Sequence, residues 1–464
     1  MAGRTTANTE PETTVDPRQE LWQCQPRAWR LLLREVDRLC AANPYAEQLR
    51  ERMRTETGTR LVDWLDYLCL EPSATLCDEL LSAGYRIGTD GRTWHHPGGL
   101  FPRWVLGESP AGFPRLGFGI QVESVDGFVA TQANPSLVHG SPAAPLRWSL
   151  VADAPQAAVV VVERHGVAGF TAAEPTATQR AAIAAARSLF DQRPRPLSLE
   201  DRHAGFVEAQ RRFDTASQQL GRDGACDLFF ASERRYWQQR NRAARVQRER
   251  QDRLGLGWAN HDHHTYRSSR EHFATLIATL ELMGFECRER FYAGDQAGWG
   301  AQVLEHPGCG LVVFADVDLL PEEVAGDFPH HGLPPRDAFG TVGLWCQLHG
   351  EAFLSAGMHH LECQFDFDAA RAQLADAGIP SMAPFTDFPF LRQAFTEGEV
   401  WQVPEEHLRE LERRGVISPQ QAAEFRTHGA RGSHLEILQR DEGYKGFNQT
   451  GISDIIHRTD PRRK

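Results

Sequence analysis

Three side chains that lie far apart in the sequence have the types that a mononuclear metal centre needs. His263, His360 and Glu436 each stand in a short segment whose pattern is typical of a β-strand. Two imidazoles and one carboxylate on one face of a metal ion leave coordination positions open for a substrate and for dioxygen, and non-haem Fe(II) oxygenases use this ligand set. The sequence therefore predicts a divalent metal ion at these residues, Fe(II) first, with Mn(II), Zn(II) or Ni(II) as alternatives.

Each of these residues also has an explanation that needs no metal. A histidine in an apolar strand is more often a hydrogen-bonded core residue than a ligand, and the pair His330-His331, which stands among prolines, is typical of a loop. Glu436 is harder to explain in this way, because it stands in the apolar run Leu435–Leu438 and burying a carboxylate without a partner is costly. The occurrence of all three residues on corresponding strands favours a metal site.

The elements that must position these residues follow a repeated order in the second half of the chain. A strand-like segment over 262–267 precedes an amphipathic helix over 273–283, and further strands surround a turn at 306–308. A second unit begins near Met358, and its helix runs from Asp368 to Ala377. Paired βαβββ units of this kind build the vicinal-oxygen-chelate barrel of glyoxalases and extradiol dioxygenases. We therefore predict an α+β fold with a vicinal-oxygen-chelate-like barrel of paired βαβββ units.

The first half of the chain carries a second, shorter copy of the same order of elements. Its turn His96-Pro97-Gly98 matches His306-Pro307-Gly308, and residues 162–170 match residues 438–447. Chance similarity between two such stretches is the alternative. The alignment places Asp63 opposite His263, Ile120 opposite His360, and Val159 or Val160 opposite Glu436. Because an aliphatic side chain cannot bind a metal, this copy is predicted to be degenerate and metal-free.

The length and composition of the chain indicate how many domains it contains and where they begin and end. A chain of 464 residues has room for about three domains. We expect a disordered tail over 1–17, a helical lead-in and the degenerate module over 18–172, a helical linker over 173–255, and the catalytic module over 256–464.

The same numbers exclude several classes of partner. A net charge of −12 argues against general nucleic-acid binding, and the absence of a run of about 18 apolar residues argues against a membrane span. The nine cysteines are scattered and never spaced as C-x-x-C, which indicates reduced thiols rather than disulfides or a zinc knuckle. We therefore expect a cytoplasmic protein, and the sequence predicts no oligomeric state.

The catalytic segment, about 200 residues long, resembles the 2-oxoadipate dioxygenase/decarboxylase (hydroxyglutarate synthase) family. Members carry a D-H-x-x-x-R strand, an N-H pair and a final Y-x-E-F-x-x-R-like strand, followed by a Gly-Phe segment. The counterparts here are Asp262, His263 and Arg267, then His359-His360, then Glu436 with Arg440, and finally Gly446-Phe447, Ile455-Ile456 and Arg458-Thr459.

The resemblance implies a role for each matched residue. It implies that the two histidines and Glu436 bind Fe(II) and that Arg267 holds a substrate carboxylate. Residues that would orient these groups are Tyr266, His264, His359 and Arg440. Two departures bear on the substrate rather than on the metal: His359 replaces the usual Asn, and Glu362 stands where a small, Thr-like residue is common.

The leading hypothesis is an Fe(II)-dependent oxygenase that acts on a small 2-oxo acid or a related carboxylate, with dioxygen as the second substrate and with decarboxylation coupled to hydroxylation. One alternative is a metal-dependent lyase or isomerase of the vicinal-oxygen-chelate type, which consumes no oxygen. Another is a protein that binds a small molecule without catalysis, for which no metal is needed.

Overall fold

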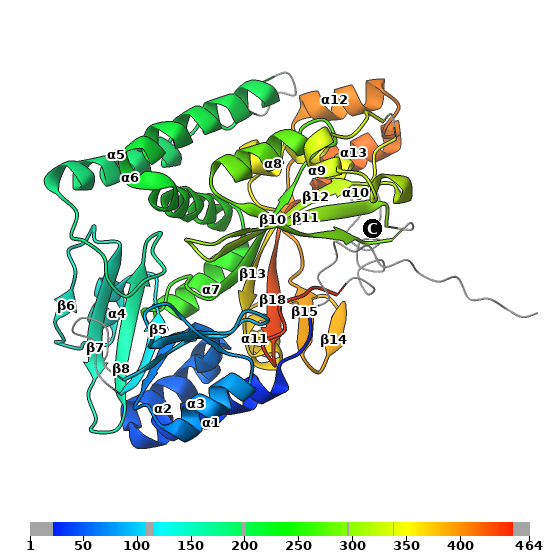
Figure 1. Cartoon of the computed structure of the whole chain (residues 1–464). Coiled ribbons are helices and arrows are strands. Elements are labelled where there is room, and N and C mark those ends of the chain that lie inside the picture. The colour runs from blue at the N-terminus through cyan, green and yellow to red at the C-terminus, as the bar shows by residue number, and fades with distance from the viewer. Residues whose placement is uncertain (1–21, 108–115, 197–200, 295–296, 337, 449–464) are drawn as a thin grey trace, which may run out of the picture.

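Two eight-stranded mixed sheets, one in each half of the chain, form the framework of the computed structural model (Figure 1). The structure describes residues 22–107, 116–196, 201–294, 297–336 and 338–448, so the predicted tail over 1–17 lies outside it. The strand order of the first sheet is β2-β3-β4-β1-β5-β8-β7-β6. Its strands are β1 (Leu65–Leu70), β2 (Arg86–Ile87), β3 (Thr93–His95), β4 (Arg103–Leu106), β5 (Gly117–Gln121), β6 (Val138–His139), β7 (Leu146–Ala152) and β8 (Ala158–Arg164).

The second sheet repeats this order as β10-β11-β12-β9-β13-β18-β15-β14. Its strands are β9 (His261–Arg267), β10 (Glu286–Tyr292), β11 (Trp299–His306), β12 (Leu311–Asp318), β13 (His360–Gln364), β14 (Thr386–Phe388), β15 (Leu391–Phe395) and β18 (His434–Arg440). A two-stranded sheet of β16 (Val400–Trp401) and β17 (Ala430–Arg431) is inserted between β15 and β18.

Each sheet consists of two βαβββ units joined through their first strands. In the first module, the helices of the two units are α3 (Ala74–Ser82) and α4 (Val125–Thr131). In the second module they are α8 (Phe273–Leu282) and α11 (Phe367–Asp376). Strand β1 pairs antiparallel with β5, and β9 pairs antiparallel with β13. The predicted α+β fold of paired βαβββ units, with a second copy of the module, is therefore confirmed.

Further helices precede, connect and extend the two modules (Figure 1). They are α1 (Pro26–Ala42), α2 (Pro44–Arg52), α5 (Ala177–Asp191), α6 (Arg202–Gln239), α7 (Arg242–Asp252), α9 (Phe328–His331), α10 (Thr341–His349), α12 (Glu405–Arg413) and α13 (Pro419–His428). Short π- or 3₁₀-helical turns occur at Met53–Thr57, Leu61–Trp64, Pro321–Glu323 and Ala352–Ala356. Helix α6 is interrupted at Gly221, whose φ of 75° is in the left-handed region that favours glycine.

The main core of the second module lies between its sheet and helices α6, α8 and α11. Phe230 of α6 packs there against Tyr266 of β9, and Leu361 of β13 and Leu435 of β18 belong to the same cluster. Because side chains alternate along a strand, the residues between these apolar ones face the opposite side of the sheet. No helix in the described ranges has both the length and the apolar character needed to cross a lipid bilayer.

Candidate metal centre

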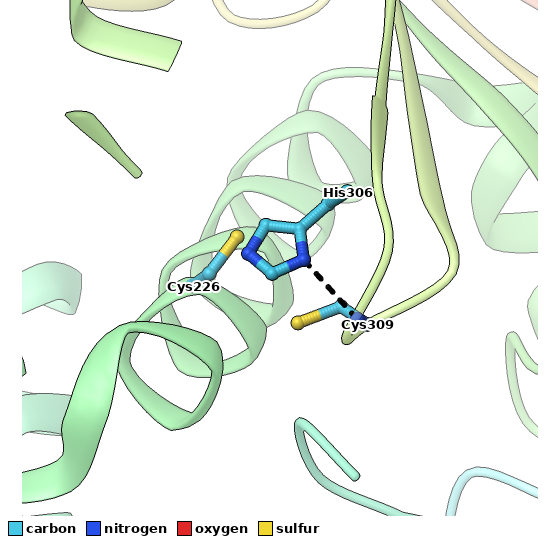
Figure 2. A group of neighbouring side chains, drawn as sticks. All are labelled: Cys226, His306 and Cys309. Atoms are coloured by element: carbon cyan, nitrogen blue, oxygen red, sulfur yellow. Dashed lines mark hydrogen bonds between the residues drawn. The ribbon is translucent and has the colours of Figure 1, made fainter. Parts of the chain in front are cut away.

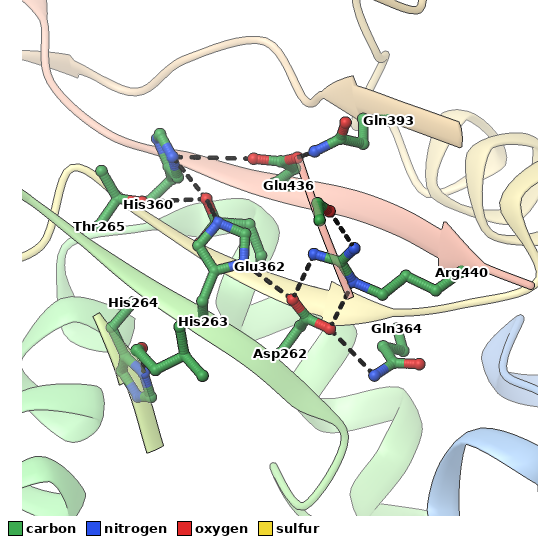
Figure 3. Close-up of polar contacts among 12 residues, drawn as sticks. Asp262, His263, His264, Thr265, His360, Glu362, Gln364, Gln393, Glu436 and Arg440 are labelled. Atoms are coloured by element: carbon green, nitrogen blue, oxygen red, sulfur yellow. Dashed lines mark hydrogen bonds and ion pairs between the residues drawn. The ribbon is translucent and has the colours of Figure 1, made fainter. Parts of the chain in front are cut away.

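Three neighbouring strands at the middle of the second sheet bring the predicted ligands together. Glu362 of β13 is paired with His263 of β9 on one side and with Glu436 of β18 on the other. His360, two residues before Glu362, points to the same face. The cross-strand register therefore places two imidazoles and two carboxylates on one patch of the sheet, on the side opposite the helices (Figure 3).

His263, Glu362 and Glu436 offer ligand atoms that all lie within 4.8 Å of one another, and His360 lies beside the two carboxylates. Oε1 of Glu362 lies 2.8 Å from Nε2 of His263 and 2.6 Å from Nε2 of His360, and Oε2 of Glu436 lies 3.7 Å from the same His360 nitrogen. Two neighbouring ligands of one ion, each bonded at about 2.1 Å, are themselves about 3 Å apart. Two of the three predicted ligands, His263 and Glu436, therefore form one group with Glu362, which was not predicted, and the third, His360, lies beside this group through its contact with Glu362.

Burial makes this group unfavourable without a cation. It raises the pKa of Glu362 well above its ordinary value, an effect that the neighbouring Glu436 reinforces, and it raises the pKa of Glu436 itself to about 7. It also lowers the pKa values of His263 and His360, so both imidazoles favour the neutral form. Oε2 of Glu362 has no hydrogen-bond partner in the described part of the chain. Buried lone pairs of this kind fit a divalent ion.

Asp262 fixes the tautomer and direction of His263. Its Oδ2 accepts a hydrogen bond from Nδ1 of His263 at 2.9 Å, which leaves the Nε2 lone pair facing the centre. Arg440 donates to both oxygens of Asp262 at 3.0 and 3.2 Å, and Gln364 donates to Oδ1 at 3.1 Å. Burial would raise the pKa of Asp262, but the charge of Arg440 and the hydrogen bond from His263 hold it well below its ordinary value.

Other side chains orient the remaining groups. Nδ1 of His359 lies 2.6 Å from Nδ1 of His360, so the Nε2 atom of His360 remains directed at the carboxylates. Nε2 of Gln393 donates to Oε1 of Glu436 at 2.9 Å, and the hydroxyl of Thr265 donates to Oε1 of Glu362 at 3.0 Å. The structure therefore places His359 and Arg440 where residues that support the ligands are expected.

A small cavity of about 60 Å³ opens beside the four groups. Arg267 lines it and lies 3.9 Å (Nε to Oδ2) from Asp316, whose pKa burial raises to about 8. The rest of its wall is mostly aromatic, formed by Trp299, Phe314, Phe385, Phe395 and Phe447. One guanidinium in an apolar pocket of this size suits a small carboxylate.

Two residues that were expected near the metal lie on the other face of the sheet. The hydroxyl of Tyr266 donates to Oε2 of Glu233 on α6 at 3.1 Å, and Nδ1 of His264 donates to the carbonyl of Val312 at 3.2 Å. The expectation that Tyr266 and His264 neighbour the metal is therefore wrong, because on β9 the side chains that share a face with His263 are two and four residues further along. The residue pairs predicted to close the motif set, Ile455-Ile456 and Arg458-Thr459, lie outside the described residues.

The first module has the same scaffold without the ligands, and its register corrects the sequence alignment. Arg164 donates to both oxygens of Asp66 at 2.7 Å, as Arg440 does to Asp262, and this anchors the comparison. The counterparts of His263, His360, Glu362 and Glu436 are then Tyr67, Gly117, Gly119 and Val160.

The predicted counterparts Asp63 and Ile120 are wrong, whereas Val160 is right. Asp63 lies in the 3₁₀ turn before β1, where it pairs with Arg60, and Ile120 faces the apolar core. Within the described residues, the first module contains no group of three or more side chains suited to a metal ion.

Comparisons with known proteins add little to this description. No protein-family model matches the sequence, and no curated protein matches it. Solved structures similar to part of the chain include methylmalonyl-CoA epimerase from Mycobacterium tuberculosis (12% identity over 39% of this chain and 88% of that one, TM-score 0.23). A mutant of 4-hydroxymandelate synthase from Streptomyces coelicolor is also similar (12% identity over 73% of this chain and 96% of that one, TM-score 0.28). So is the uncharacterised Shigella flexneri protein YdcJ, which includes domain DUF1338 (16% identity over 55% of this chain and 73% of that one, TM-score 0.24). TM-scores this low do not establish a common fold, and the vicinal-oxygen-chelate fold is assigned from strand order and register.

Proposed function

We propose that this chain is a mononuclear metal enzyme of the vicinal-oxygen-chelate type, which uses Fe(II) and dioxygen to oxidise a small 2-oxo acid or a related carboxylate. The observation that carries the proposal is the buried group of His263, Glu362 and Glu436, with Nε2 of His360 2.6 Å from Glu362, beside a cavity that Arg267 lines. When bound, the ion supplies a Lewis-acidic, redox-active centre with open positions.

The side chains around the centre would bind the substrate, orient the metal ligands and keep water away from the reacting atoms. Arg267 offers the fork of N–H groups that matches a carboxylate, which would fix one end of the substrate relative to the centre. The aromatic wall excludes water from the reacting atoms. Asp262 with Arg440, together with His359, holds the two imidazoles in place before any substrate binds.

Glu362 favours a second candidate function, a lyase or isomerase that uses Mn(II), Zn(II) or Ni(II) and no oxygen. With two histidines and two glutamates as ligands, an octahedral ion keeps only two positions. A substrate that chelates through two oxygens would occupy both positions and leave none for dioxygen. The lyase or isomerase function therefore requires Glu362 to be a metal ligand, and the oxygenase function requires that it is not.

The test reconstitutes the full chain anaerobically with Fe(II) and screens 2-oxo acids of increasing length for oxygen uptake and carbon dioxide release. We expect uptake that requires iron, is absent from His263→Ala, and persists in Glu362→Gln. Turnover with Mn(II), Zn(II) or Ni(II) and without oxygen uptake would favour the second function. A chain that binds none of these metal ions would overturn both.

A further inference from the structure

A second group of metal-binding side chains lies at the hairpin between β11 and β12 and shares no residue with the centre above (Figure 2). Cys226 comes from α6, His306 ends β11, and Cys309 lies in the turn that follows. The two Sγ atoms and a ring nitrogen of His306 are all within 4.8 Å of one another. Cys226 and His306 are buried, while Cys309 is half-buried.

Hydrogen bonds define which nitrogen of His306 carries its proton. Nε2 lies 3.1 Å from the carbonyl oxygen of Met283 at the end of α8, and because a carbonyl only accepts, Nε2 is the donor. Nδ1 therefore carries the lone pair, which accepts the backbone N–H of Cys309 at 3.2 Å, and an ion bound at Nδ1 would replace this hydrogen bond. Metal-binding histidines characteristically donate one ring N–H to a carbonyl or carboxylate and offer the other nitrogen to the ion.

The first module shows what this histidine does without the cysteines. His96 makes the same bond, with Nε2 3.0 Å from the carbonyl of Ala83, and its ring contacts Tyr85 as His306 contacts Phe285. The residue at the position of Cys309 is Gly99, and Nδ1 of His96 makes no hydrogen bond in the described part of the chain. The shared fold therefore accounts for the histidine but not for the two thiols.

We propose that Cys226, His306 and Cys309 bind a zinc ion, with the carboxylate of Asp223 or a water molecule as the fourth ligand. Two thiolates and one imidazole are a donor set that zinc prefers in tetrahedral sites. Sγ of Cys309 lies 3.3 Å from the Asp223 carbonyl oxygen, which places Asp223 beside the thiol. Its Oδ1 lies 3.9 Å from Nε2 of His306, so the carboxylate would have to turn toward Nδ1 to bind the ion.

Such an ion would tie α6 to the β11–β12 hairpin. Glu233 of the same helix accepts a hydrogen bond from Tyr266. Tyr266 belongs to β9, the strand that also carries His263, and faces the opposite side of the sheet from His263. Cys309 also lines a cavity of about 730 Å³ that residues of both modules surround, which gives the ion a route to this thiol. The proposal does not depend on the function assigned to the first centre, because the two sites have no residue in common.

The experiment measures metal content and thiolate coordination in the full chain. His263→Ala/Glu436→Ala removes two of the four groups of the first centre, one histidine and one carboxylate, so that zinc retained by this variant reports on the thiol site. Cys226→Ser and Cys309→Ser are then added together, and Cys24→Ser/Cys77→Ser serves as a control that loses the same number of thiols. Cobalt(II) loading of the otherwise unchanged chain provides a second measurement, because thiolate-to-cobalt charge-transfer absorption cannot arise from histidine and glutamate ligands.

We expect about one zinc per chain in the background variant and in the control, and none after loss of Cys226 and Cys309. The charge-transfer band should disappear only with these two cysteines. Zinc content that is unaffected by their loss, or cobalt loading without the band, would overturn the proposal. So would a Cys226–Cys309 disulfide that persists in freshly purified protein supplied with zinc.

Discussion

Replacing Glu436 by glutamine should have opposite effects on the metal-free and the metal-bound protein. Burial raises the pKa of this carboxyl from 4.5 to about 7, so the folded protein binds the proton more tightly than the unfolded chain does. That contribution to stability is present below pH 4.5 and is lost as the pH rises through 7. At pH 8 the ionised, buried carboxylate costs on the order of 3 kcal/mol of unfolding free energy.

Glutamine cannot ionise, and its amide oxygen can still accept the hydrogen bond that Gln393 donates. Metal-free Glu436→Gln should therefore exceed the unchanged protein in stability at pH 8 by up to about 3 kcal/mol, a rise of several degrees in melting temperature, and by much less at pH 5. Added metal should stabilise the unchanged protein strongly and the variant little, because the variant has lost an anionic ligand.

Thermal unfolding at pH 5 and pH 8, in a chelator and in excess Mn(II), measures all four states. Glu271→Gln, at an exposed position on the same module, controls for the loss of one negative charge. A variant that is less stable than the unchanged protein at pH 8 in chelator would refute the assignment of a costly buried carboxylate. Equal stabilisation of both proteins by Mn(II) would refute the role of Glu436 as a ligand.

Three further substitutions test separate parts of the site. Arg267→Lys should raise KM for a carboxylate substrate about 10- to 100-fold with unchanged metal content, because the two-pronged contact is lost; steady-state kinetics and metal analysis check this, and an unchanged KM would contradict it. Arg440→Lys should weaken metal binding about 10- to 100-fold in calorimetric titration, because lysine cannot donate to both oxygens of Asp262 in the same way and His263 is then held less firmly. Unchanged affinity would show that the Asp262–Arg440 pair stabilises the fold and does not support the metal ligands. Tyr266→Phe should leave metal affinity unchanged and lower the free energy of unfolding in chemical denaturation by about 1–3 kcal/mol, because Glu233 loses a buried hydrogen-bond donor. Loss of metal binding in this variant would show that Tyr266 supports the metal ligands.

The order of elements was predictable from the sequence because each unit carries its own periodicity. The helix over 273–283 has an apolar stripe, and strands beside the turn at 306–308 are nearly continuous apolar runs. The assignment of His263, His360 and Glu436 to one face needed only their positions on three strands that the fold brings together. Alternation along β9 would also have excluded Tyr266, three residues from His263, and that signal was available in the sequence.

Register was not predictable in the same way. The alignment that placed Ile120 opposite His360 is wrong because a shift by an odd number of residues turns a side chain from the cavity to the core. The sequence showed that Glu362 departs from the family pattern, in which a small, Thr-like residue is common at this position. Its contact with both imidazoles, however, depends on how β13 is paired with β9 and β18, and no local property of the sequence encodes that pairing.

The two modules together separate what the fold requires from what the metal requires. An Asp–Arg pair braces the sheet in both modules, as Asp66 with Arg164 and Asp262 with Arg440, so this pair by itself does not identify a metal centre. The counterparts of His360 and Glu362 in the first module are glycines in crowded places. A Cβ on Gly119 would overlap the ring of Tyr67, and Gly117, at a φ of 140°, lies against the backbone of Ala158. A ligand at position 117 would therefore require the strand of Ala158 to move, and a ligand at position 119 would require the ring of Tyr67 to move, so the first module does not accept these two ligands as it stands.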